Sequence, residues 1–170
     1  MSAIPSVDLS DFVSGDSKRK EKFVKEIGSA FEDIGFVALS GHFLSDELVD
    51  NLYKEIKKFF NLPQEVKDKY EIEGIGGQRG YTSFGKEHAK GKKEGDLKEF
   101  WHFGQYVEDN PTLREEYPDN VIVEELPDFN EIGKETYKML EKTAKYVLRA
   151  LALHLDLEET YFDDYIKNGN

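Results

Sequence analysis

The 170-residue chain carries 35 Asp or Glu and 23 Lys or Arg, a formal net charge of −12 at pH 7. So acidic a surface argues against a nucleic-acid or anionic-membrane partner, because both need a basic patch. The sequence has no cysteine, which excludes disulfides and thiolate metal sites. Its apolar content, with 12 Phe and 9 Tyr, supplies a core and suits one compact domain over residues 1–170. No signal peptide or membrane span is recognisable, so we expect a soluble, cytoplasmic protein.

Two short strands and one helix are predicted first. Ile4–Leu9 alternates apolar and polar residues and predicts a strand. The apolar run Phe36–Leu39, between glycine-containing breakers, predicts an inner strand buried on both faces, around which the rest of the chain packs. Between them, a turn at 14–17 supplies Asp16 or Ser17 as a helix cap. The helix that follows should end near Gly35, and its apolar stripe is Phe23, Ile27, Ala30, Phe31 and Ile34.

A second helix is expected after Ser45, and Pro63 should end it and open a short helix through Lys69. Its apolar stripe consists of Leu48, Leu52, Ile56, Phe59 and Phe60. The glycine-rich stretch 71–80 lacks the spacing of a phosphate-binding loop and is interpreted as a flexible connector.

A hairpin and a long helix complete the predicted elements. Residues 80–84 and 97–107 are aromatic-rich and predict two strands joined by a long charged connection. A wide apolar stripe from Asp128 to Leu155 predicts the longest helix. His154-Leu155-Asp156 has the H-x-D spacing of iron ligands, but positions two apart on a helix point about 200° apart. We therefore interpret His154 as a helix-end residue rather than a metal ligand.

Five segments, in the right order, resemble the isopenicillin N synthase-like, 2-oxoglutarate/Fe(II)-dependent dioxygenases. Residues 34–42 are similar to that family's "GFF…NHG" strand and residues 59–67 to its "FF-LP-E-K" segment. The remaining matches are 4–10, Gly80-Tyr81 and 96–100. The resemblance implies an α+β fold in which several helices pack on a few β-strands. This fold is the N-terminal part of a double-stranded β-helix (jelly-roll) oxygenase.

The resemblance also implies what the complete enzyme does. Such an enzyme is an oxidoreductase that oxidises a small-molecule substrate, using Fe(II) and, in most relatives, 2-oxoglutarate. The iron ligands and the 2-oxoglutarate clamp belong to the C-terminal jelly-roll core, and this sequence stops about where that core should begin. We therefore expect the core to be absent, the 170-residue chain to bind no cofactor by itself, and the chain alone to be inactive.

The resemblance places three residues at the substrate pocket. Arg79 is expected to hold a substrate carboxylate through its planar guanidinium, and Tyr81 and Trp101 to form an apolar wall with a polar edge. The opposite strand faces, Gly80 with Thr82 and Phe100 with His102, are an open alternative. Another is that Arg79 makes a surface ion pair and the aromatic residues are ordinary core.

A second function class remains open at this point. A free-standing, non-catalytic binding or interaction module would also lack iron ligands. If the chain is the front part of a larger fold, its strand edges should be uncovered and should favour self-association.

Overall fold

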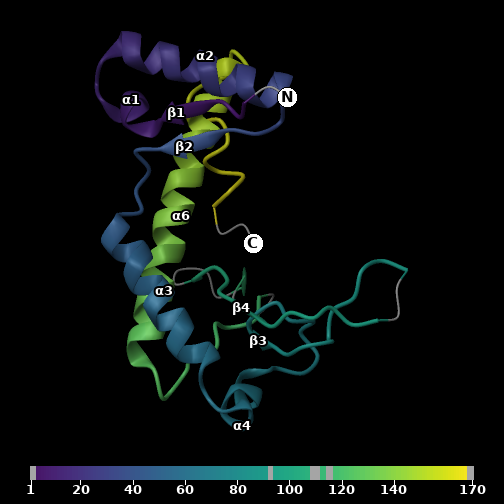
Figure 1. The fold of residues 1–170 in the computed structure, drawn as a ribbon. Helices are drawn as coiled ribbons and strands as arrows, with labels where there is room; N and C mark the ends of the chain where they lie inside the picture. The colour runs from purple at the N-terminus through teal and green to yellow at the C-terminus, as the bar shows by residue number, and fades with distance from the viewer. Residues whose placement is uncertain (1–2, 92–93, 108–111, 114–116, 168–170) are drawn as a thin grey trace. The chain divides into compact units, whose positions relative to one another are not determined.

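The computed structural model describes residues 3–91, 94–107, 112–113 and 117–167. They divide into two compact units: unit 1 comprises Met1–Ser45 and Lys138–Gly169, and unit 2 comprises Asp46–Tyr137. Unit 1 contains β1 (Ser6–Asp8), α1 (Leu9–Val13), α2 (Ser17–Asp33) and β2 (Ala38–Ser40). Unit 2 contains α3 (Asp46–Phe60), α4 (Gln64–Lys67), a 3-10 turn (Asp68–Tyr70), β3 (Gly80–Thr82) and β4 (Phe100–His102). The 28-residue helix α6 (Pro127–His154) contributes its first part to unit 2 and its remainder to unit 1 (Figure 1).

Helix α2 forms as its sequence predicts. The Asp16 side chain accepts hydrogen bonds from the backbone N–H groups of Lys18 and Arg19, at 2.8 and 3.1 Å. These bonds satisfy two of the donors that every helix N-terminus leaves unpaired. The helix ends at Asp33, two residues before Gly35.

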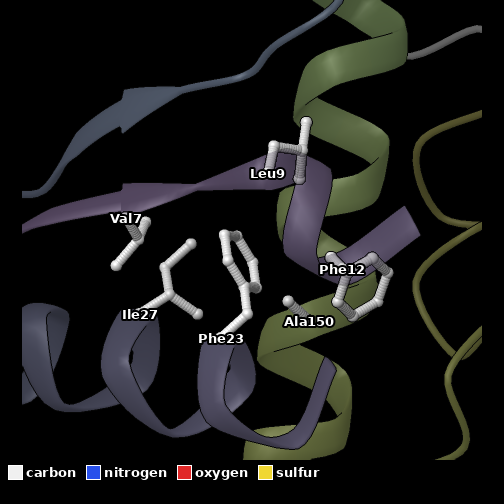
Figure 2. Packing of buried hydrophobic residues seen from close by; sticks show 6 residues of the cluster. All are labelled: Val7, Leu9, Phe12, Phe23, Ile27 and Ala150. Atoms are coloured by element: carbon white, nitrogen blue, oxygen red, sulfur yellow. The ribbon is translucent and has the colours of Figure 1, made fainter. Parts of the chain in front are cut away.

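The core of unit 1 joins β1, α1, α2 and α6. Phe23 and Ile27 project from α2 toward Val7 of β1, and Ala150 of α6 lies beside Phe12 of α1 (Figure 2). All of these side chains are buried, which accounts for the apolar spacing of the helices.

The small sheet of unit 1 corrects two predictions. Strands β1 and β2 pair in parallel, with Val7 opposite Leu39. The prediction that Phe36–Leu39 is an inner strand buried on both faces is wrong, because β2 pairs only with β1 in the described part of the chain and Phe36 is 68% exposed. In a two-stranded sheet both strands are edge strands, so neither of them is an inner strand. The predicted Ile4–Leu9 strand is also shorter than expected, because the Asp8 side chain accepts from Ser10 N–H at 2.8 Å and starts α1 at Leu9.

Ion pairs fasten residues 155–167 to the rest of unit 1. Arg149 donates two hydrogen bonds to the Asp163 carboxylate, at 3.1 and 2.6 Å, and Lys145 lies 3.1 Å from it. Lys20 of α2 pairs with Glu159 at 2.7 Å. The hydrogen bonds from Arg149 are the main reason that the pKa of Asp163 falls to about 2.

Unit 2 is built on an aromatic core. Phe59 of α3 is fully buried, and its ring contacts those of Phe60, Tyr70, Tyr81, Trp101 and Phe129. Pro63 follows α3 and precedes α4, as predicted. The described residues thus form mixed helical and strand structure with two small sheets, which confirms that part of the α+β prediction. Among them, no helix is long and apolar enough to cross a bilayer.

Candidate functional site

The hairpin of β3 and β4 brings two of the predicted site residues together. The strands pair antiparallel, with Tyr81 opposite Trp101. Directly opposed residues point to the same face of a sheet. Both rings pack on Phe59, at centroid distances of 5.8 Å for Tyr81 and 4.8 Å for Trp101. This face of the hairpin therefore belongs to the aromatic core of unit 2.

The other face of the hairpin carries the alternative set. Phe100 and His102 alternate with Trp101 along β4. Their rings lie 4.7 Å apart, and His102 Nδ1 lies 2.6 Å from the carbonyl oxygen of Gly77. His102 is exposed, whereas Tyr81 is 1% exposed. The structure thus shows that Tyr81 and Trp101 face the aromatic core of unit 2. Which face of the hairpin meets a substrate stays a prediction.

A polar network surrounds the hydroxyl group of Tyr81. The hydroxyl donates to Glu99 Oε2 at 2.5 Å and accepts from Gln64 Nε2 at 3.1 Å. The same Glu99 oxygen accepts from Lys67 Nζ at 2.6 Å. Lys67 and Glu99 side chains are only 7% and 17% exposed, so this is a buried ion pair. It ties α4 to the residue that precedes β4.

The network shifts the pKa of two groups upward. Burial raises the pKa of Tyr81, and the hydrogen bond to Glu99 raises it further. Burial alone would lower the pKa of Lys67, but the hydrogen bond and the charge of Glu99 outweigh it, and the pKa lies above its usual value. Tyr81 is therefore a neutral hydrogen-bond donor and Lys67 a fixed cation at neutral pH.

Arg79 lies under the segment that follows β4. It is 4% exposed, and its Nη1 donates to the Gln78 carbonyl oxygen at 2.7 Å. A Cβ at Gly104 would stand 1.7 Å from Arg79 Cζ, so the guanidinium rests directly against the glycine backbone. Asn120 clamps that backbone by exchanging two hydrogen bonds with Gly104, at 2.8 and 2.9 Å. Arg79 is thus a buried residue, unlike the exposed arginine that a surface ion pair would require.

Trp101 is half-buried against Phe59 and Phe129. Its indole Nε1 is buried and has no hydrogen-bond partner among the residues that the structure describes. A buried N–H without an acceptor costs about 1–3 kcal/mol. The Trp101 Nε1–H group is therefore a hydrogen-bond donor without an acceptor among the described residues. It lies at the polar edge of the aromatic wall that the sequence predicts.

Sequence reasoning missed Lys67, Gln64 and Glu99. They lie on the polar sides of predicted elements, and their partners are 17 to 32 residues away. The one available signal was Glu99, a carboxylate within the predicted aromatic strand 97–107, because a charge buried there demands a partner.

The described residues do not offer an iron site. No three His, Asp or Glu side chains among them converge on a position where a metal ion could be held. His154 Nε2 lies 3.1 Å from Glu32 Oε1, and its ring packs so closely on α2 that a Cβ at Gly28 would be 2.2 Å away. His154 thus has a packing role at the end of α6, and we assign no step of metal chemistry to these side chains.

Residues 4–125 match the family model described as "non-haem dioxygenase in morphine synthesis N-terminal". The chain belongs to the 2-oxoglutarate/Fe(II)-dependent dioxygenase family. The resemblance seen in the sequence is thereby confirmed, and the match extends over most of this dioxygenase chain.

Curated relatives agree with this assignment. A 2-oxoglutarate-Fe(II) type oxidoreductase of Aspergillus fumigatus is 31% identical over 172 residues, covering 94% of this chain and 49% of the relative. Leucoanthocyanidin dioxygenase of Malus domestica is 32% identical over 157 residues, covering 92% of this chain and 42% of the relative. The chain thus spans about half the length of the curated relatives that it matches.

Solved structures show the same fold. A 2OG-Fe(II) oxygenase family protein from Caulobacter crescentus superposes with a TM-score of 0.86 at 37% identity, over 100% of this chain and 54% of that one. A full-length Neurospora crassa protein, solved in complex with alpha-KG and thymine, superposes with a TM-score of 0.74 at 25% identity, over 94% of this chain and 50% of that one. The architecture of this dioxygenase region therefore has counterparts in experimentally determined structures.

Proposed function

We propose that this chain is the N-terminal region of a non-haem Fe(II), 2-oxoglutarate-dependent oxygenase that oxidises a small organic substrate. The observation that carries the proposal is the match of residues 4–125 to the dioxygenase N-terminal family. The Neurospora crassa structure with alpha-KG and thymine supports a small-molecule substrate. Bound Fe(II) and 2-oxoglutarate supply the oxidising chemistry in such an enzyme.

We expect the cofactors to be held by residues outside this chain. A facial iron site needs two His and one carboxylate with open positions, and His154 is already packed against α2 and hydrogen-bonded to Glu32. The 170-residue chain alone is therefore expected to be inactive and to bind neither cofactor tightly. The cytoplasmic location and the self-association through strand edges stay predictions.

The hairpin is the proposed contribution of this chain to the substrate pocket. Arg79, Tyr81 and Trp101 are proposed to form one wall, with Tyr81 at the edge of an open cleft. Their burial gives this wall a fixed shape, which is what a pre-organised binding surface needs. The Phe100 and His102 face is the alternative contact surface, because it is the side of the hairpin that unit 2 does not bury in its aromatic core.

Two experiments test the proposal. Anaerobic titration of this chain with Fe(II) should show no stoichiometric micromolar site, and His154→Ala should change nothing; a site that His154→Ala abolishes contradicts the assignment.

In the protein encoded by the complete gene, succinate formation from 2-oxoglutarate should depend on Fe(II) and on an organic substrate. In that protein, Trp101→Phe should raise the KM for the substrate if the face with Tyr81 and Trp101 meets it. His102→Ala should raise that KM instead if the face with Phe100 and His102 does. His42→Ala, at an exposed site in unit 1, is the matched control. A complete protein that forms no succinate with any substrate, and a gene without later iron ligands, would favour the binding module.

A further inference from the structure

The glycine-rich stretch interpreted as a flexible connector is a loop whose ends are held together. Glu71 pairs with Gly80 in an antiparallel bridge, which fixes both ends on unit 2. Between them, residues 73–77 form turns, and no atom of the described residues beyond the chain neighbours lies within 4 Å of an ideal Cβ at Gly74 or Gly76. Both glycines have a positive φ, and glycine adopts either sign of φ at similar cost. Residues 73–77, called the strap below, can therefore change conformation without moving the ends of the loop.

A side chain of the hairpin holds the strap in place. His102 Nδ1 lies 2.6 Å from the carbonyl oxygen of Gly77. A carbonyl oxygen can only accept, so Nδ1 carries a proton and is the donor of this hydrogen bond. His102 is exposed, and water can therefore take the place of either partner. A hydrogen bond that exchanges with water in this way makes a small net contribution. The bond from His102 thus fastens the strap only weakly.

A buried hydroxyl beneath the strap acts in the opposite direction. Thr82 is 5% exposed, and its Oγ1 has no hydrogen-bond partner among the described residues. This oxygen is packed behind Gly77, where a Cβ would come within 2.8 Å of it. A buried hydroxyl without a partner raises the free energy of the arrangement that encloses it. When Gly77 moves away, water can reach the hydroxyl and remove this cost. The closed strap is therefore favoured by His102 and disfavoured by Thr82.

We propose that the strap opens and closes over the outer face of the hairpin, with the hydrogen bond from His102 to Gly77 as its latch. The outer face is the one with Thr82, Phe100 and His102, because Thr82 lies opposite Phe100 in the register. Since one interaction favours the closed strap and another opposes it, both forms are populated. Opening frees the His102 N–H donor and the Thr82 hydroxyl together. The strap thereby decides when these two groups can meet water or a ligand oxygen.

The opening of the strap does not depend on the proposed oxygenase activity. Control of substrate access does rest on it, because a substrate that meets the outer face in the complete enzyme has to displace Gly77 first. The opening itself can be measured in this 170-residue chain. Such a measurement can succeed or fail whatever the complete protein catalyses.

NMR relaxation dispersion of the backbone amides 73–78 measures the population of the open strap, and the imidazole nitrogen shifts report which nitrogen of His102 is protonated. In the wild type we expect exchange at these amides and a proton on Nδ1. His102→Ala removes the latch and should raise the open population roughly three- to tenfold. Thr82→Val removes the hydroxyl that gains water on opening and should lower the open population by a similar factor. His88→Ala, at another exposed histidine of unit 2, should leave it unchanged.

Any of four results would overturn the proposal. The first is an open population that His102→Ala leaves unchanged, whether or not the wild type shows exchange. The second is an open population in Thr82→Val that equals or exceeds that of the wild type. The third is an equal effect of His88→Ala and His102→Ala. The fourth is a wild-type His102 that is protonated on Nε2 alone. If Thr82→Val does not fold, as judged by circular dichroism, His102→Ala decides the outcome, because His102 is exposed.

Discussion

Replacing Glu99 with alanine should destabilise unit 2 far more than removing any surface carboxylate. The change leaves the Lys67 ammonium, 7% exposed, without the oxygen that stands 2.6 Å away. It also takes away the acceptor of the Tyr81 hydroxyl, at 2.5 Å. Removing one partner of a buried ion pair costs about 3–5 kcal/mol. Because the Glu99 side chain keeps 17% exposure, water can relieve part of this cost, and we expect about 3 kcal/mol.

Urea denaturation followed by tryptophan fluorescence measures this cost, since Trp101 is the single tryptophan and packs on the core of unit 2. With a typical slope of about 1–3 kcal/mol/M, the midpoint should fall by roughly 1–3 M. The matched control is Glu87→Ala, which breaks an ion pair whose side chains are 52% and 45% exposed and should cost less than about 1 kcal/mol.

A double variant separates the ion pair from simple packing. Lys67→Met with Glu99→Leu removes both charges together and should be clearly more stable than Glu99→Ala alone, because no buried charge is left unpaired. Equal midpoints for Glu99→Ala and Glu87→Ala would refute the reasoning. So would a double variant that is as unstable as the single one.

Three further predictions concern unit 1. The stability that Asp163 contributes should be fully present above pH 3.8 and disappear as the pH falls through about 2. Between pH 4 and pH 1.5 the melting temperature should therefore fall more in the wild type than in Asp163→Asn, and equal falls would contradict the assignment. Leu39→Asp, which places a carboxylate against the core of unit 1, should cost several kcal/mol. The control Lys57→Glu, on an exposed face of α3 in unit 2, should stay within about 0.5 kcal/mol. Equal melting temperatures for the two would contradict the packing of β2. Gly28→Ala should destabilise the protein, because the new Cβ would be 2.2 Å from the His154 ring. In a His154→Ala background the same change should instead stabilise the protein by about 1 kcal/mol, the helix propensity of alanine over glycine. A loss of stability in both backgrounds would contradict the contact.

The sequence predicts this fold best where the signal is local. The stripe of Phe23 and Ile27 and the cap at Asp16 specify α2 because both lie within a few residues of the turns that they stabilise. The parallel pairing of Val7 with Leu39 is non-local, and a short apolar run cannot show how many neighbours its strand will have. For that reason the sequence overstates the burial of Phe36–Leu39.

The candidate site, too, could be predicted from the sequence only where the signal is local. Tyr81 and Trp101 could be found from the aromatic hairpin and the family resemblance, but their facing direction depends on the pairing register. The Lys67–Glu99 pair depends on a contact 32 residues apart. The position of Arg79 against Gly104 depends on a close approach that no sequence pattern marks.

The division of the chain into units has a consequence for its synthesis. Unit 2 is continuous from Asp46 to Tyr137, whereas unit 1 needs both Met1–Ser45 and Lys138–Gly169. Because a ribosome releases the N-terminus first, β1, α1 and α2 emerge long before Ala150, which completes their core. Their apolar faces should stay uncovered while unit 2 folds, which would make the emerging chain a target for chaperones. Nascent chains halted near residue 137 should therefore be cleaved by protease within residues 1–45, and 170-residue chains released from the ribosome should resist.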